Sequence, residues 1–268
     1  MFITNFTYDG ATLTSKGYMV CDFGSGDNNG MGSELTFTTV PINKGVKFLM
    51  ADAKYDQYLT TTIQICKSPC NHDKQEDLII TPSEISTLSR WLNKKSFRPL
   101  TFDSTDWSGI RFEATFNIKT INIGGDCYGL ELEMITNRPF AVKTAVTQTM
   151  AFVDGALTQS FNDTSDEIGY IYPTTMTITM GATAGNLSIS NSQESNRSTV
   201  IKNCQAGEVI TIAYPTISTN SNSHAIVDDF NYVFPRVANS SSIVANVFTV
   251  NLPCTIVLTY DPIVKIAL

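Results

Sequence analysis

Apolar and polar residues alternate with a period of two along much of this chain. Alternate positions are apolar in Ile110–Ile118 and again in Tyr128–Met134. This period places the apolar side chains on one face of a strand. Gly124 and Gly125 stand between the two runs, and a glycine pair followed by Asp126 is typical of a hairpin turn. The pattern predicts a β-hairpin with one buried face.

One segment just before this hairpin follows a helical period instead. Thr81 and Glu84 have the spacing of a capping box, in which each residue's side chain bonds the other's backbone N–H. Pro82 falls at the first helical position, where its missing N–H costs nothing. The apolar stripe consists of Ile85, Leu88 and Trp91 or Leu92. We therefore expect one short helix near residues 82–93.

The rest of the chain reads as short strands separated by polar loops. The expected strands are Leu35–Val40, Val46–Met50, Leu59–Ile65, Met176–Met180, Leu187–Ile189, Val209–Tyr214, Val247–Val250 and Thr255–Tyr260. The loops are 24–32, 67–76, 191–198 and 217–225. Regular short strands with turn signals indicate antiparallel sandwiches. A break at Pro139 predicts two domains, residues 1–145 and 146–268, with the boundary between Pro139 and Met150.

The composition narrows the class of protein. Of 268 residues, 42% are hydrophobic and 16% are charged, compared with about 25% charged in ordinary soluble domains. Serine, threonine and asparagine make up the difference, as in β-rich virion proteins, adhesins and secreted proteins. The net charge of −7 argues against tight nucleic-acid binding. The first residues do not resemble a signal peptide, and no apolar run is long enough for membrane insertion.

One cluster has a spacing that suggests metal binding. Cys66, Cys70 and His72 lie close together in sequence, but a tetrahedral zinc site needs a fourth ligand and usually a second pair. We interpret the cluster as a loop with incidental thiols, and we expect all six cysteines to be reduced. The sequence therefore predicts no metal-binding and no cofactor-binding residue.

Catalytic groups are also not evident. Glu131 and Glu133 share the polar face of one strand, and Asp228 and Asp229 are adjacent, whereas a glycosidase needs two carboxylates across a cleft. A Ser–His–Asp triad would have to recruit His72 or His224, and neither neighbourhood has a nucleophile motif. We predict that the chain has no catalytic residue and is not an enzyme.

Five segments, in this order, resemble the distal tail (Dit) proteins of long-tailed, siphovirus-type bacteriophages. They are FTYDG at Phe6–Gly10, the helix ending at Trp91-Leu92 with the alternating strands after it, CYGLELEMITNRPF at Cys127–Phe140, VDDFNYVFPR at Val227–Arg236, and NVFTVNLPCTIVLTYDP at Asn246–Pro262. One departure is Asn239-Ser240-Ser241, where family members often carry a Gly-x-Asn turn. The geometry of that turn is therefore open.

The resemblance implies a mainly β fold with two β-sandwich domains. The N-terminal domain, with its short helix, would build a ring, usually a hexamer, and the C-terminal domain would be a galectin-like sandwich. Such a ring joins the tail tube protein to the baseplate hub at the virion tail tip, carries receptor-binding proteins and lets DNA pass without specific binding. The implied particle is assembled in the bacterial host cytoplasm, and a tailocin-like particle is a related possibility.

Two surfaces are candidates for contacts with partners, and each has a simpler interpretation that the sequence leaves open. Leu35–Phe48 and the loop 67–76 are expected to touch neighbouring subunits, or else to be solvated loops. A different function, a carbohydrate-binding module or adhesin, would use aromatic side chains as stacking surfaces. The available ones are Tyr170, Tyr172, Tyr214, Phe230 and Tyr232, and the alternative for them is core packing.

Overall fold

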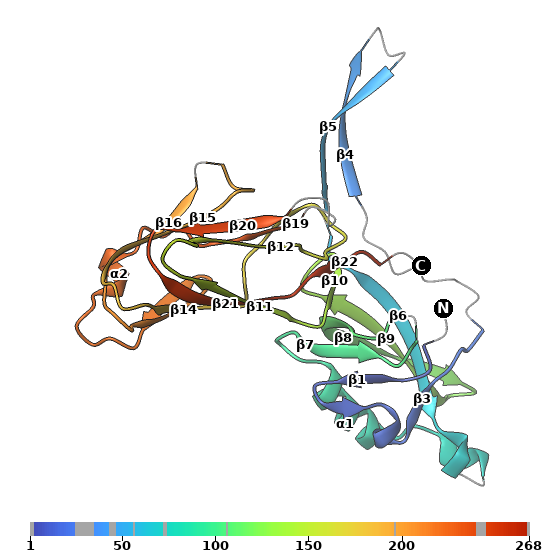
Figure 1. The fold of residues 1–268 in the computed structure, drawn as a ribbon. Coiled ribbons are helices and arrows are strands. Elements are labelled where there is room, and N and C mark those ends of the chain that lie inside the picture. Colours follow the sequence, from blue (N-terminus) through green and yellow to red (C-terminus); the bar gives the residue numbers. More distant parts are fainter. Residues whose placement is uncertain are drawn as a thin grey trace. The chain divides into compact units, whose positions relative to one another are not determined.

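The computed structural model describes residues 3–24, 35–42, 47–55, 57–71, 74–105, 107–195, 197–239 and 245–266 (Figure 1). The chain divides into two compact units. The first consists of Met1–Val142 with Lys265–Leu268, and the second is Lys143–Val264. Almost all regular structure is strand, so the predicted mainly β class is confirmed. The chain's return to the first unit after residue 264 was not anticipated from the sequence.

The first unit is built on an antiparallel sheet with the strand order β2-β1-β7-β8-β9-β6-β3. The strands are β1 (Phe6–Tyr8), β2 (Ala11–Thr12), β3 (Tyr18–Val20), β6 (Thr60–Lys67), β7 (Arg98–Phe102), β8 (Ile110–Ile123), β9 (Asp126–Thr136) and β10 (Ala141–Lys143). The hairpin predicted around the glycine pair is β8–β9. Its alternation is confirmed, since Phe112, Phe116, Leu132 and Met134 are all buried.

The predicted helix is α1 (Pro82–Leu92), which begins with the expected capping box. Thr81 Oγ1 accepts from the Glu84 backbone N–H, and Glu84 Oε2 accepts from the Thr81 N–H at 2.8 Å. Lys67 Nζ lies 2.8 Å from the same carboxylate. Burial raises the pKa of Glu84, but the bonds from Lys67 and Thr81 outweigh this and hold it below its ordinary value. Glu84 therefore both caps the helix and links it to Lys67 of β6.

Trp91 joins this helix to the sheet. Its indole Nε1 donates to the backbone oxygen of Tyr8 at 3.1 Å, and its ring stacks on Phe6 with centroids 6.1 Å apart. Phe116 packs against both Phe6 and Tyr8. At the end of the helix, Asn93 Nδ2 donates to the Phe116 carbonyl at 2.9 Å. Large rings bury much apolar area each, so this aromatic cluster fixes the helix on β1 and β8.

The second unit is a sandwich of two antiparallel sheets. One has the order β11-β21-β14-β17-β18 and the other β12-β20-β15-β16. Their strands are β11 (Val146–Phe152), β12 (Thr158–Phe161), β14 (Thr175–Met180), β15 (Gly185–Asn191), β16 (Ser198–Cys204), β17 (Val209–Ala213), β18 (Thr216–Thr219), β20 (Asn246–Val250) and β21 (Cys254–Tyr260). A single core of inward-facing side chains, such as Met176, Ile189, Phe248 and Leu258, fills the space between the sheets.

Smaller elements complete the chain. A separate pair is formed by β13 (Gly169–Ile171) and β19 (Val237–Asn239), and β22 (Ile263–Val264) follows the sandwich. The short helix α2 (Ile226–Asp229) and the 3-10 turns η1 (Thr14–Lys16), η3 (Pro69–Asn71) and η4 (Gln75–Leu78) lie in connections. The prediction of a loop at 217–225 is partly wrong, because residues 216–219 form the edge strand β18. The turn at Ser240-Ser241 and most of the loop 24–32 lie outside the described residues.

Removing the helix cap tests the stability of the first unit. Thr81→Ala deletes the hydroxyl that satisfies the Glu84 N–H, so we expect a loss of about 1 kcal/mol in the free energy of unfolding. Both tryptophans of the chain, Trp91 and Trp107, belong to this unit. Urea titration followed by tryptophan fluorescence therefore reports on it directly. Ser83→Ala, at an exposed position of the same helix, should change the midpoint little.

Candidate functional site

The strongest candidate site is a β-hairpin whose two strands pair with no other strand that the structure describes. β4 (Leu35–Ile42) and β5 (Lys47–Tyr55) form a separate two-stranded sheet. Of their seventeen residues, all but Ile42 and Tyr55 are exposed. A two-stranded hairpin alone in water is marginally stable. Its large apolar side chains are mostly exposed, and at its base the ring of Tyr55 contacts that of Phe140 with centroids 6.2 Å apart.

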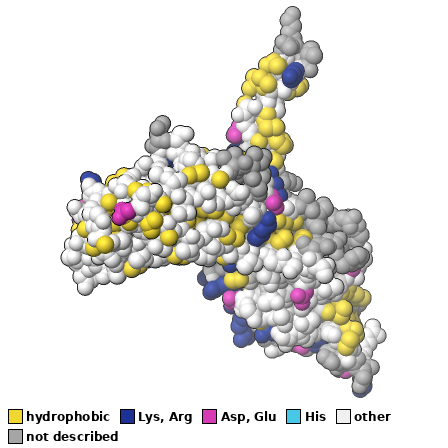
Figure 2. All heavy atoms as spheres, viewed as in Figure 1, with side chains coloured by type: hydrophobic (Ala, Val, Ile, Leu, Met, Phe, Trp, Pro, Cys, Tyr) yellow, Lys and Arg dark blue, Asp and Glu magenta, His cyan; other side chains and the backbone are white. Residues whose placement is uncertain are grey.

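The strand register sorts the hairpin side chains onto two faces. Thr39 pairs with Met50, and Pro41 pairs with Phe48. The register shifts at a bulge between Thr38 and Thr39. Because side chains alternate along a strand, one face carries Leu35, Phe37, Pro41, Phe48 and Met50. We call this set the apolar face of the hairpin. Phe37, Phe48 and Met50 are 52%, 61% and 62% exposed. Figure 2 shows hydrophobic side chains running along this hairpin.

The opposite face of the hairpin is mixed in character. Val40 and Leu49 pair there, and Lys47, Asp52 and Lys54 add charges. The hairpin is therefore amphipathic although neither face is buried. A sheet surface of this kind is typical of a segment that another protein chain covers.

The second predicted contact segment, residues 67–76, is held close to its own unit at the start. Lys67 Nζ donates to the Ile79 carbonyl at 2.7 Å and to the Asp77 carbonyl at 3.2 Å, besides its ion pair with Glu84. The side chain of Lys67 is 11% exposed. His72 lies outside the described residues, and within the described part no group of histidine, cysteine and acidic side chains could hold a metal ion.

The candidate carboxylates are parts of salt bridges and turns. Glu131 Oε1 lies 3.2 Å from Lys119 Nζ, and Glu133 accepts from Asn117 at 3.3 Å, both on the polar face of β8–β9. Asp228 and Asp229 belong to α2. Glu131 and Glu133 belong to the first unit, and Asp228 and Asp229 belong to the second.

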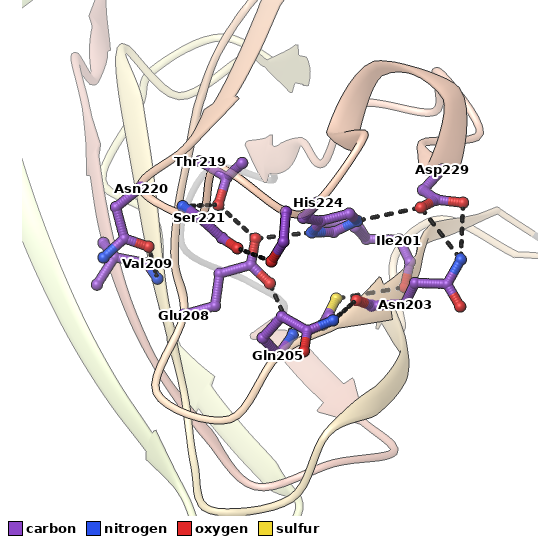
Figure 3. A network of polar contacts seen from close by, with 12 residues as sticks. Ile201, Asn203, Gln205, Glu208, Val209, Thr219, Asn220, Ser221, His224 and Asp229 are labelled. Atoms are coloured by element: carbon purple, nitrogen blue, oxygen red, sulfur yellow. Dashed lines mark hydrogen bonds and ion pairs between the residues drawn. The ribbon is translucent and has the colours of Figure 1, made fainter.

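His224 is the centre of a buried polar network that the sequence did not reveal (Figure 3). Its Nδ1 lies 2.7 Å from Glu208 Oε1, and its Nε2 lies 3.4 Å from Asp229 Oδ2. The side chains of His224 and Glu208 are 1% and 0% exposed. Glu208 also accepts from the Gln205 N–H at 2.7 Å and from the Thr219 hydroxyl. The network ties the turn before β17 to β18 and α2.

The geometry of this network indicates that it stabilises the fold and does not form a catalytic site. Both imidazole nitrogens face carboxylates, so neither faces a nucleophile. The hydroxyls of Ser221 and Ser223 lie 3.2 Å apart and bond to each other. Burial raises the pKa of Glu208, but hydrogen bonds from Thr219, Gln205 and His224 more than compensate and lower it below its ordinary value. The carboxylate is thus held ionised to satisfy its neighbours.

The aromatic candidates in the second unit divide into two groups. Phe230 is 4% exposed and belongs to the core, as the core-packing interpretation predicts. Tyr170, Tyr172, Tyr214 and Tyr232 are between 37% and 59% exposed. For these four tyrosines the core-packing interpretation is wrong.

Taken together, the two units define a mainly β protein with surfaces for contact and with its candidate acids and histidine in structural pairs. Family models described as "Phage tail protein N-terminal domain" and "Phage tail C-terminal domain" match residues 1–138 and 140–260. The chain belongs to this family of phage tail proteins. It is therefore a component of a bacteriophage tail.

A solved structure has a similar fold. The crystal structure of the Dit (gp 19.1) protein of SPP1, described as a paradigm of the hub adsorption apparatus in Gram-positive infecting phages, is similar over 97% of this chain and 99% of that chain. The TM-score is 0.67 at 11% sequence identity. The predicted resemblance to distal tail proteins is thereby confirmed at the level of fold. No curated protein matches the sequence.

None of the described helices is long and apolar enough to cross a membrane.

The lowered pKa of Glu208 gives the second unit a defined dependence on pH. A carboxylate whose folded pKa is depressed stabilises the fold above its ordinary pKa, here 4.5, and loses that contribution as pH falls through the lowered value. We expect amide exchange in residues 205–229, measured by mass spectrometry, to accelerate as pH is lowered below about 4.5, after correction for intrinsic rates.

Glu208→Gln should remove this acid-induced acceleration and cost about 1–3 kcal/mol at neutral pH, since the buried His224 loses its charged partner. Glu133→Gln, on the polar face of β9, is the control and should leave exchange in residues 205–229 as it is. Acceleration of equal size in the wild type and in Glu208→Gln would contradict the assignment.

Proposed function

We propose that this protein is a ring-forming structural subunit of the tail tip, joining the tail tube to the baseplate hub. The observation that carries the proposal is the apolar face of the β4–β5 hairpin, which is exposed in the single chain. The protein's membership in the phage tail family and its Dit-like fold support the same role.

A ring needs two different complementary patches on each subunit. An amphipathic hairpin with open strand edges supplies one of them, because it offers backbone pairing at its edges and apolar contact on its face. The proposed acceptor is a surface of the next copy of the same chain. Burial of Phe37, Phe48 and Met50 there would stabilise the assembly by roughly 25 cal/mol for each Å² of apolar surface covered.

The two domains would have different roles. Residues 1–145 would form the ring, and we expect that ring to be a hexamer. Residues 146–268 would form a galectin-like sandwich that projects outward. The hub protein and receptor-binding proteins are the proposed partners of the assembled ring. The net charge of −7 supports a lumen that repels DNA phosphates and lets DNA slide through. Assembly would take place in the bacterial host cytoplasm.

A structural role without catalysis fits the side-chain chemistry. The acidic candidates are engaged with Lys119 and Asn117 on a polar sheet face, and both nitrogens of His224 face carboxylates. These arrangements support folding and assembly rather than proton transfer.

The hairpin can be tested with two matched double variants. Phe37→Thr with Phe48→Thr alters the apolar face, whereas Val40→Thr with Leu49→Thr alters the opposite face at similar exposure. Threonine keeps strand propensity in both. We expect the wild type to form a closed ring by light scattering and negative-stain imaging. The first variant should lose most of that assembly, and the second should retain it.

Two results would count against this proposal. The wild-type protein could stay monomeric at high concentration both alone and with its tail tube partner. The two variants could also assemble equally well, which would remove the hairpin's apolar face from the interface.

A further inference from the structure

Three aromatic–proline dipeptides, far apart in the sequence, meet on the surface of the second unit. They are Tyr172-Pro173, Tyr214-Pro215 and Phe234-Pro235. Together with Met176 and Ile212, residues of all three dipeptides line one pocket. The pocket therefore has an aromatic rim over an apolar floor.

The rim is exposed and held in place. The rings of Tyr172 and Tyr214 stack with centroids 4.1 Å apart and an interplanar angle of 14°, and Phe234 meets Tyr214 edge-on at 5.2 Å. Tyr214 is nevertheless 54% exposed. Aromatic side chains ordered before binding lose little conformational entropy when a ligand arrives. We call Tyr170, Tyr172 and Tyr214 the tyrosine platform.

Arg236 extends the platform. Its guanidinium lies 4.2 Å from the ring centre of Tyr170 and 5.9 Å from that of Tyr172. The pairing of β13 with β19 explains this placement, since Ile171 pairs with Val237 and sets the flanking residues side by side. Nε of Arg236 donates to Glu194 at 2.6 Å, and Nη2 contacts the same carboxylate.

A second pocket adjoins the first and is polar. The two share Pro235, and the second is lined by Glu194, Arg197 and Arg236 together with Ser190, Asn191 and Thr199. Glu194 is almost fully buried and also pairs with Arg197 at 3.2 Å. Both pockets are shallow depressions open to solvent, each with room for about one water molecule. A ligand would therefore lie on the exposed tyrosine rings above these depressions rather than inside them.

We propose that this surface binds an uncharged saccharide chain of a bacterial surface. A pyranose ring has an apolar C–H face that packs on aromatic rings and hydroxyls that bond planar polar groups. The platform supplies exposed rings, and the neighbouring pocket supplies a guanidinium, an amide and hydroxyls. The inference does not depend on ring formation.

The test uses the full chain on an array of bacterial surface oligosaccharides, followed by titration calorimetry with the strongest array hit. Tyr214→Ala should weaken binding by about two- to tenfold, the effect of losing one aromatic contact. Tyr172→Ala with Tyr214→Ala should abolish it. Arg236→Lys keeps a cation beside Glu194 but loses the planar group over Tyr170, and should also weaken binding. Tyr58→Ala, at the same 54% exposure in the first unit, should have no effect.

The outcomes separate this site from the proposed ring. Selective binding that the platform variants lose, with unchanged assembly mass and thermal stability, supports the saccharide site. The proposal is overturned if no oligosaccharide binds, or if the platform variants bind as the wild type does. It is also overturned if Tyr214→Ala lowers the assembly mass, because the platform would then be a protein contact.

Discussion

The exposure of the β4–β5 hairpin is the constraint on which the functional account depends. Two paired strands bury neither of their faces, so the side chains of Phe37, Phe48 and Met50 remain in water in the single chain. Removing such side chains from water favours association by the hydrophobic effect. The amphipathic character set by the register then decides which face is covered. In the proposed ring, a neighbouring subunit would cover that face.

In each unit, buried and half-buried side chains link elements that are far apart in the sequence. In the first unit, Trp91 fixes the helix by one hydrogen bond and by stacking against the β1 ring of Phe6. In the second, the Glu208–His224 pair closes the loops at the end of the sandwich. Buried polar groups of this kind contribute when every partner is satisfied and cost stability when one is lost.

Much of this architecture could be predicted from the sequence, because local rules decide it. The cap at Thr81 and the alternation through Phe112 and Phe116 are local signals, and the structure follows them. The strand at Leu35 was also predicted, and its segment was expected at the surface. Its pairing with β5 in a separate sheet was not predicted, since alternation does not show which strand is the partner. β18 was missed because its Ser and Thr residues read as a loop, and pairing with β17 decides its conformation. The convergence of Glu208, His224 and Asp229 depends on tertiary folding alone.

The most direct test of the central claim is amide hydrogen exchange in β4 and β5, measured on the full chain as monomer and as assembled particle. The account predicts rapid exchange throughout Leu35–Ile42 and Lys47–Tyr55 in the monomer and strong protection of the same amides after assembly. Equal exchange in the two states, with protection appearing elsewhere in the first unit, would contradict it.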